Sequence, residues 1–402
     1  MALLNRLCHI GFHVPERQQL ASDLVCKFGF ELFATRVGEW RRQLAFRRGG
    51  AIFVVNEKLQ PVSGKAPPIS SSGHSMDGGM LYDVDPQHAV STASNICFEV
   101  EDVPGISQSL QERGCHILIS PTTVADEDGS VTYSVVRSIV GNISHTLLDR
   151  TQYCGPFLPG FHVVKNALEK LQRAKENTYF DHITYACPQG SSQAVLEWYK
   201  NCFGFQRFFV HSQDKAAEGY RIQGGGVGLQ LSAMRHCRNG LTLLDQQDCK
   251  FVLAESLPEQ RNNQVDTFLK QHGGAGIQHV ALYTTDIVET IAAMTKSGAS
   301  FFKPPVTYYS EKNKEQEIQQ AGQDLQLLKD HGILLDAEVV GEGDSNGPAH
   351  HRKQYLMQIF TKPLFTEETF FLEFIERHGA EGFGEGNVRA LWKAVQNHMD
   401  QQ

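Results

Sequence analysis

Glu373 is the residue from which a chemical role can first be argued. It lies in the middle of Thr369–Arg377, an aromatic and β-branched stretch that is typical of a buried strand. A buried, unpaired carboxylate would cost several kcal/mol or would take up a proton, so Glu373 needs a cation. This cation is either an Arg or Lys side chain across the sheet, which is the commoner case, or a metal ion. The choice depends on the elements that surround Glu373.

These elements belong to a unit that recurs along the chain. A strand-like segment followed by a helix-like segment begins four times, at Leu7–Val14, Asn95–Val100, Asp181–Ala186 and Gln278–Tyr283. The repetition predicts an α+β fold of four βαβββ modules, two in each half of the chain, followed by a C-terminal helix over Val388–Met399. We expect two domains, 1–154 and 178–402, joined by a linker over 155–177 that begins with Gly-Pro and Pro-Gly turns.

Comparing the two halves of the repeat brings three candidate metal ligands together. In the second half the equivalent positions hold His182, His279 and Glu373, and in the first half they hold His9, Asn95 and Thr146. Two imidazoles and one carboxylate form a facial triad, which binds Fe(II) and leaves adjacent positions open. Zn(II) accepts the same ligands, so the spacing leaves the metal undecided. The first half, with one ligand of three, is predicted to be a non-catalytic copy of the scaffold.

Other histidines have a simpler interpretation. A lone His on an apolar strand is usually a packed, hydrogen-bonded core residue, and we expect this for His9, His13 and His145. His350 and His351 lie in a polar loop and are expected to be hydrated. The triad differs from these because three ligand side chains occur jointly, at matching positions of the repeat, and in one half only.

Composition excludes several classes of protein. A chain of 402 residues can form two cores, and its net charge of -8, without a basic stripe, argues against nucleic acid as a partner. No apolar run reaches membrane-spanning length, so we expect no transmembrane segment. Nine scattered cysteines without a Cys-x-x-Cys pair are interpreted as reduced thiols of an intracellular protein.

Four longer motifs are specific to one family. They are Gly-Gly-Ala-Gly-Ile-Gln-His-Val-Ala-Leu (273–282), Met-Gln-Ile-Phe-Thr-Lys-Pro (357–363), Phe-Phe-Leu-Glu-Phe-Ile-Glu-Arg (370–377) and Gly-Phe-Gly-Glu-Gly-Asn (382–387). Together they resemble the 4-hydroxyphenylpyruvate dioxygenase family of the vicinal oxygen chelate superfamily. The segments at 157–160 and 253–258 are most similar to its dioxygenase-like branch. The resemblance covers nearly the whole chain, more weakly before residue 180, and implies two glyoxalase-like domains, each a half-open β-barrel.

The resemblance also implies a cofactor, a substrate class and a pocket. It implies one Fe(II) per chain, held by His182, His279 and Glu373, with an aromatic α-keto acid and O2 as reactants. The residues that it places in the substrate pocket are Gln264, Gln278, Gln358, Phe360, Phe383 and Asn387. Their amides can hydrogen-bond a keto acid or a phenol without adding charge. From the residues alone, Gln358 is equally compatible with a polar sheet edge, and the two Phe residues with ordinary core.

The chain departs from the family's motifs at two pocket positions. Ala254 stands where the motif has Asn before Glu-Pro, and Val388 stands where a second Phe follows Gly-Asn. One polar anchor is therefore missing and one aromatic wall is smaller. We expect an Fe(II)-dependent oxygenase that converts 4-hydroxyphenylpyruvate and O2 to 4-hydroxymandelate and CO2. The dioxygenase-like branch implies that the product serves the ubiquinone head group, and that the protein is mitochondrial.

Several alternatives stay open at this point. The product could instead be homogentisate, or the substrate another aryl keto acid. From a different class, the chain could be a catalytically silent relative that binds an aromatic acid or a protein partner at a membrane surface. A cytoplasmic location is the second choice, and a homodimer is compatible with the resemblance.

Overall fold

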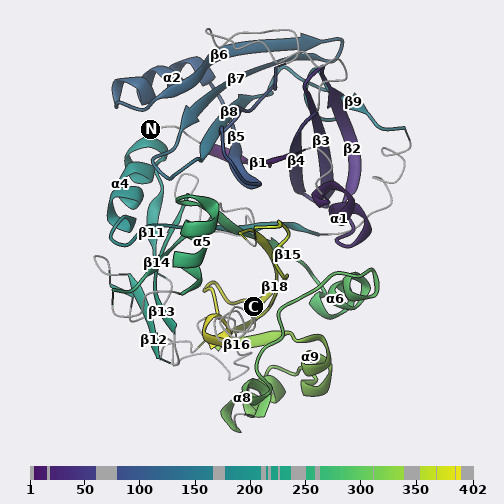
Figure 1. The fold of residues 1–402 in the computed structure, drawn as a ribbon, viewed down its shortest axis with the longest axis vertical. Coiled ribbons are helices and arrows are strands. Elements are labelled where there is room, and N and C mark those ends of the chain that lie inside the picture. Colours follow the sequence, from purple (N-terminus) through teal and green to yellow (C-terminus); the bar gives the residue numbers. More distant parts are fainter. Residues whose placement is uncertain are drawn as a thin grey trace, which may run out of the picture.

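The computed structural model describes residues 4–15, 19–59, 79–165, 177–209, 214–215, 219–224, 227–236, 250–258, 263–310, 312–338, 354–367, 369–384 and 386–390. Within these ranges the chain forms two nine-stranded sheets, one from each half. Each sheet curls into a half-open barrel, and the first half lies above the second in the view of Figure 1. The predicted α+β architecture of two glyoxalase-like units is therefore confirmed.

The first sheet consists of two modules joined at its centre. Its strands are β1 (Leu4–Pro15), β2 (Glu31–Val37), β3 (Arg41–Arg48), β4 (Ala51–Lys58), β5 (Thr92–Val100), β6 (Ile117–Asp126), β7 (Gly129–Arg137), β8 (Ser144–Asp149) and β9 (His162–Val163). Helix α1 (Leu20–Cys26) follows β1, and α2 (Val103–Glu112) follows β5. The strand order is β6-β7-β8-β5-β1-β4-β3-β2-β9, with β1 and β5 antiparallel, and β4 and β8 parallel to the strands that open their modules.

The second sheet repeats this arrangement. Its strands are β10 (Tyr179–Ala186), β11 (Gln206–Phe208), β12 (Tyr220–Gly224), β13 (Val227–Arg235), β14 (Lys250–Ser256), β15 (Gly276–Tyr283), β16 (Leu334–Glu338), β17 (Gln354–Phe360) and β18 (Phe371–His378). The order is β11-β13-β14-β10-β15-β18-β17-β16, with β12 beside β13. The opening strands β10 and β15 are antiparallel neighbours, as β1 and β5 are. The four-module prediction is therefore confirmed.

The helices of the second half connect and cover its strands. They are α4 (Ser192–Phe203), α5 (Gln264–His272), α6 (Ile287–Lys296), α7 (Val306–Ser310), α8 (Lys312–Gln320) and α9 (Leu325–His331). The side chain of Asp286 caps α6 by accepting from the backbone N–H of Glu289 (2.8 Å). Helices α7 to α9 lengthen the last module, and α8 and α9 lie at the end of the molecule away from the first half (Figure 1).

The chain ends and the predicted linker differ in detail from the prediction. The C-terminal helix is described over residues 386–390, so the rest of its predicted range lies outside the described residues, as do His350 and His351. The first residues of the predicted linker pack against the first half, because Phe157 and Leu158 are buried and β9 pairs with β2. The domain limits themselves stay a prediction. Among the described helices, none is both long enough and apolar enough to cross a bilayer.

Candidate metal centre

Three neighbouring strands bring His182, His279 and Glu373 together. In the sheet register, Ala281 of β15 lies opposite His182 of β10 on one side and opposite Glu373 of β18 on the other. His279 precedes Ala281 by two residues, so its side chain is on the same face of the sheet. The three ligand candidates therefore point together into the curled second sheet, although 191 residues of sequence separate the first from the last (182 to 373).

The ligand atoms of the triad lie close enough to share one ion. One atom from each residue lies within 4.8 Å of the others, and all three side chains are buried. Nε2 of His182 is 3.3 Å from Oε2 of Glu373, and Nε2 of His279 is 3.5 Å from the same oxygen. In the part of the chain that the structure describes, the partners of Glu373 are these histidines and Gln358 rather than a Lys or Arg.

The charges within the triad stabilise an ionised carboxylate. Burial raises the pKa of the Glu373 carboxyl, but the charge and hydrogen bonding of His182 and His279 together outweigh burial and lower the pKa to about 2. Burial lowers the pKa of His182, whereas the charge of Glu373 raises it, with a net increase. Burial also lowers the pKa of His279, and for this residue burial prevails. The pKa shifts of Glu373 and His182 both favour a charged pair, in the place where a metal ion would supply the positive charge.

The donor set fits Fe(II). Two imidazole nitrogens and one carboxylate oxygen on one face are the ligands of non-haem Fe(II) centres, and they leave adjacent coordination positions for other ligands. Nδ1 of His279 is buried and has no hydrogen-bond partner among the described residues. The Nε2 atoms of both rings point toward Glu373, as coordination of a shared ion requires. Zn(II) would accept the same donors, so this geometry fits a divalent ion of either kind.

Asp181 and Arg377 orient the first ligand, and neither role was predicted from the sequence. A register shift between Phe180 and His182 makes Asp181 the extra residue of a β-bulge. Its Oδ1 lies 2.8 Å from Nδ1 of His182, and Arg377 binds both carboxylate oxygens at 2.7 Å. Burial raises the pKa of Asp181, but the charge and hydrogen bonds of Arg377, together with the hydrogen bond from His182, outweigh burial and hold this pKa well below its usual range. Because Asp181 accepts the Nδ1 proton, Nε2 of His182 is free to bind a metal.

A chain of amides fixes the third ligand. Nε2 of Gln358 donates to Oε1 of Glu373 (2.8 Å), and Nδ2 of Asn387 donates to Oε1 of Gln358 (2.9 Å). The hydroxyl of Tyr308 donates to Oδ1 of Asn387 (2.8 Å). The structure therefore places two of the predicted pocket residues, Gln358 and Asn387, in contact with the triad or one step from it. Tyr308 was missed because its partner is 79 residues away in the sequence.

The two predicted pocket phenylalanines lie beside the triad. The ring of Phe383 meets the ring of His182 edge to face, with centroids 4.9 Å apart. Phe360 lies opposite Glu373 in the register of β17 and β18, so its side chain is on the same face. Both rings are buried. They form an apolar wall next to the ligand atoms, which limits the access of water.

The remaining predicted pocket residues carry unpaired amide atoms. Gln278 is the extra residue of a second bulge, next to His279, and Gln264 is the first residue of α5. Oε1 of Gln278 and Nε2 of Gln264 are buried and lack partners among the described residues. Buried amides usually have partners, so these atoms are available to a bound molecule. Ala254 pairs with Ala186, four residues after His182 on β10, so its methyl group is on the triad's face of the sheet.

The first half holds no such triad at the equivalent positions. Cys97 of β5 lies opposite His9 of β1 and opposite Thr146 of β8. In the second half, Ala281 lies in the same way between His182 and Glu373. Nδ2 of Asn95 donates to the hydroxyl of Thr146 (2.9 Å), so these two residues satisfy each other. Expected core histidines are confirmed as such: His13 is buried against Asp83 (2.9 Å), and His145 against Tyr199 (2.7 Å). His9 is also buried and contacts Cys8.

The fold and the triad together define a protein of the vicinal oxygen chelate class, and comparison with known proteins agrees. The family model of the Glyoxalase/Bleomycin resistance protein/Dioxygenase superfamily matches residues 179–319. The 4-hydroxyphenylpyruvate dioxygenase-like protein of Mus musculus is 41% identical over 396 residues, covering 97% of this chain and 96% of that protein. The 4-hydroxyphenylpyruvate dioxygenase of Caenorhabditis briggsae is 29% identical over 397 residues, covering 96% of this chain and 90% of that protein. The chain belongs to the 4-hydroxyphenylpyruvate dioxygenase-like family.

A solved structure shows the same fold. A mutant of 4-hydroxymandelate synthase from Streptomyces coelicolor superposes with a TM-score of 0.75, covering 99% of this chain and 100% of that chain. The two sequences are 21% identical, so this likeness supports the fold and not the reaction.

Proposed function

We propose that the protein is an Fe(II)-dependent oxygenase that converts 4-hydroxyphenylpyruvate and O2 to 4-hydroxymandelate and CO2. The observation that carries the proposal is the buried triad of His182, His279 and Glu373, whose ligand atoms lie within 4.8 Å of one another. A site that had lost its function would be expected to lose its metal ligands over time. The equivalent positions of the first half lack this triad, whereas the second half keeps it. Family membership supports an aromatic α-keto acid as the substrate.

Bound Fe(II) would supply the activation of O2 and the oxidative decarboxylation of the keto acid. The protein's own residues prepare the site for this chemistry. Asp181 holds the Nδ1 proton of His182, and Gln358 holds one oxygen of Glu373, so both ligands are fixed before an ion binds. Phe383 packs against His182 and keeps this side of the site dry, which protects a reactive centre from water.

The altered pocket supports the proposed product. Ala254 supplies a methyl group on the triad's face where the related dioxygenases' motif has an amide, so an aromatic substrate loses one hydrogen-bonding anchor there. A ring that is held differently presents a different carbon to the reacting centre, because attack needs atoms about 3–3.5 Å apart in the correct orientation. The benzylic carbon then becomes the site of hydroxylation in place of the ring. Formation of homogentisate is the second candidate reaction. The observation in its favour is the triad, which either product would require.

A product assay tests the proposal. The purified chain is loaded with Fe(II), mixed with 4-hydroxyphenylpyruvate in air, and its aromatic products are separated, with O2 uptake and CO2 release measured in parallel. We expect 4-hydroxymandelate and CO2 in equal amounts, and no turnover by His279→Ala. Homogentisate as the main product would contradict the assigned reaction. Absence of O2 uptake by iron-loaded protein would favour the catalytically silent alternative.

We further propose a mitochondrial location and a use of the product in making the ubiquinone head group. The support is the similarity to the dioxygenase-like branch. Fractionation of cells that express the tagged full chain tests the location, and a cytoplasmic signal alone would contradict it. Isotope-labelled 4-hydroxyphenylpyruvate tests the use, since label should reach the ubiquinone ring in cells with the wild-type chain and not with His279→Ala.

A further inference from the structure

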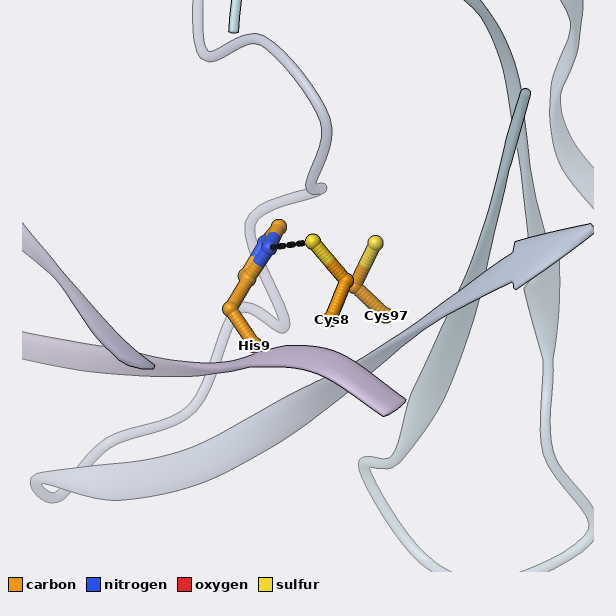
Figure 2. Close-up of side chains that lie close together, drawn as sticks. All are labelled: Cys8, His9 and Cys97. Atoms are coloured by element: carbon orange, nitrogen blue, oxygen red, sulfur yellow. Dashed lines mark hydrogen bonds between the residues drawn. The ribbon is translucent and has the colours of Figure 1, made fainter. Parts of the chain in front are cut away.

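A second cluster of metal-binding side chains lies in the first half, apart from the triad. Cys8, His9 and Cys97 each offer one ligand atom within 4.8 Å of the other two, and all three are buried. Nδ1 of His9 is 3.4 Å from the sulfur of Cys8. Figure 2 shows the two sulfur atoms and the imidazole on the same side of β1 and β5. Three donor atoms this close together can share one ion.

The cluster has an origin in the repeat. Cys8 is the extra residue of a bulge between Leu7 and His9, as Asp181 is between Phe180 and His182. The bulge turns a second side chain toward the face that carries the histidine. Cys97 occupies the register position of Ala281, opposite the histidine on the neighbouring strand. The first half therefore places two sulfur ligands around His9, at positions where the second half has Asp181 and Ala281.

We propose that Cys8, His9 and Cys97 form a site for a thiophilic d10 cation, Zn(II), distinct from the triad. Two thiolates and an imidazole are ligands of Zn(II), which accepts a Cys2His set together with one further position. The described residues supply no fourth Cys, His, Asp or Glu to this cluster, so water or another small ligand completes the coordination. The ion replaces the two thiol protons, which pass to the buffer when it binds.

Charge favours Zn(II) over Cu(I) in this buried place. Two thiolates and a neutral imidazole carry a charge of about -2, which Zn(II) cancels and Cu(I) leaves at about -1. A net charge without compensation in a buried environment is costly. The triad, by contrast, offers two nitrogens and one oxygen and no sulfur. The two sites therefore differ in the kind of metal that they prefer.

The imidazole contact argues against a simple cysteine pair. A disulfide between Cys8 and Cys97 would need only the two sulfurs, whereas His9 turns its Nδ1 toward Cys8. The His9 ring also packs edge to face against Phe157, with centroids 5.9 Å apart, and this contact holds it in the cluster. A fixed third donor is a requirement of a metal site and not of a disulfide.

Cobalt spectroscopy of the full chain tests the proposal. The reduced, metal-free protein is titrated with Co(II) without oxygen, and thiolate-to-Co(II) charge transfer is followed in the near ultraviolet. The triad contains no sulfur, so it contributes nothing to this band. We expect the band to saturate with one thiolate-bound Co(II) per chain, while Co(II) at the triad adds nothing to it, and to disappear when Zn(II) displaces Co(II).

Matched variants decide whether these residues hold the ion. Cys97→Ala installs the residue that the second half carries at Ala281, so the strand should fold, and we expect it to lose the band. His9→Gln should weaken Co(II) binding by at least about 10-fold. Cys187→Ala, which removes a buried cysteine elsewhere, should keep the band. Circular dichroism of each variant reports folding, and Zn(II) should raise the melting temperature of wild type more than that of Cys97→Ala, in which the triad alone is left to bind the ion.

Three results would overturn the proposal. The first is a wild-type protein without the charge-transfer band, and the second is a band of equal strength in Cys97→Ala. The third is a Cys8–Cys97 disulfide in freshly purified protein, seen by mass spectrometry, with no Co(II) band after reduction.

Discussion

At the residue scale, Asp181 links the charge of Arg377 to the first metal ligand. Its carboxylate receives two bonds from the guanidinium and lies 2.8 Å from Nδ1 of His182. Such outer partners set the tautomer and basicity of a ligating histidine, and their loss commonly weakens metal affinity by about 10–100-fold. We expect Asp181→Asn to weaken Fe(II) binding by about this factor, because the amide keeps the shape and loses the charge. Anaerobic competition with a chromogenic chelator measures the affinity.

The matched control for this change is Asp128→Asn, since Asp128 is exposed on the turn between β6 and β7. Its Fe(II) affinity should equal that of wild type. Equal affinity in Asp181→Asn and wild type would show that Arg377 and Asp181 only stabilise the fold at this point. The free energy of unfolding of both variants, measured in urea, separates the two roles.

Ala254 carries the prediction about product choice. It lies buried on β14 with its methyl group on the face of the triad. Ala254→Asn restores the amide that the dioxygenase motif has there, and we expect homogentisate to appear beside 4-hydroxymandelate while Fe(II) affinity stays within about 3-fold of wild type, since no metal ligand changes. Chromatography of the aromatic products gives the ratio. Ala254→Ser, whose side chain is smaller than Asn and has no amide, is the control variant. If Ala254→Asn gives the same product ratio as wild type, Ala254 does not determine the product.

At the element scale, the segment before the C-terminal helix fixes the amide chain on Glu373. Gly384 has a backbone φ of +69°, and a Cβ added there would overlap Oε1 of Gln358. Gly384→Ala should therefore displace Gln358 and free Glu373, lowering kcat by at least about 10-fold, in addition to a backbone cost of about 1–2 kcal/mol in stability. Initial rates under saturating Fe(II) and urea unfolding measure the two effects.

Gly322→Ala provides the control for backbone strain. Gly322 has a similar φ of +73°, and a Cβ there would meet no atom within 4 Å. This variant should lose about 1–2 kcal/mol of stability and keep its kcat. If Gly384→Ala and Gly322→Ala both keep the wild-type kcat, the position of the Gln358 side chain does not determine how Glu373 acts in the site.

The elements themselves were largely predictable from the sequence, because hydrophobic period and capping residues are local signals. Strands β1, β5, β10 and β15 follow from such signals, and the repeat predicted which segments of the two halves occupy equivalent positions. The hydrogen-bonding partners were not predictable. Arg377 and Asp181 are 196 residues apart, so only the folded sheet brings them together. The β-bulges that re-aim Asp181 and Cys8 also leave no clear local pattern.

At the scale of the whole molecule, the two halves share one hydrophobic core and do not form two separate bodies. The core cluster contains residues of both sheets, and the rings of Phe12 and Phe370, one from each half, lie 5.1 Å apart. Helix α4 of the second half packs on β8 of the first, where Nε2 of His145 lies 2.7 Å from the hydroxyl of Tyr199. The first half, which lacks the triad, therefore supports the second through this contact surface.

This interface makes stability depend on pH. Burial lowers the pKa of His145 to about 3, so the imidazole stays neutral in the folded protein, whereas it titrates near 6.5 when the chain unfolds. Below about pH 6.5 the unfolded state binds a proton that the folded state does not bind, so the stability supplied by neutral His145 is present above this pH and is lost as pH falls toward 3. Between about pH 7.5 and pH 5, this residue alone should lower the free energy of unfolding by about 2 kcal/mol.

The measurement compares urea unfolding at the two pH values in wild type and in His145→Gln, whose amide can still bond Tyr199. The variant should lose about 2 kcal/mol less than wild type on acidification, since other groups titrate equally in both proteins. His116→Gln replaces an exposed histidine in the same half and is the control. It should lose as much free energy of unfolding between the two pH values as wild type does. If His145→Gln loses as much stability as wild type, the imidazole is protonated in the folded state, and water must then reach the contact between the two halves.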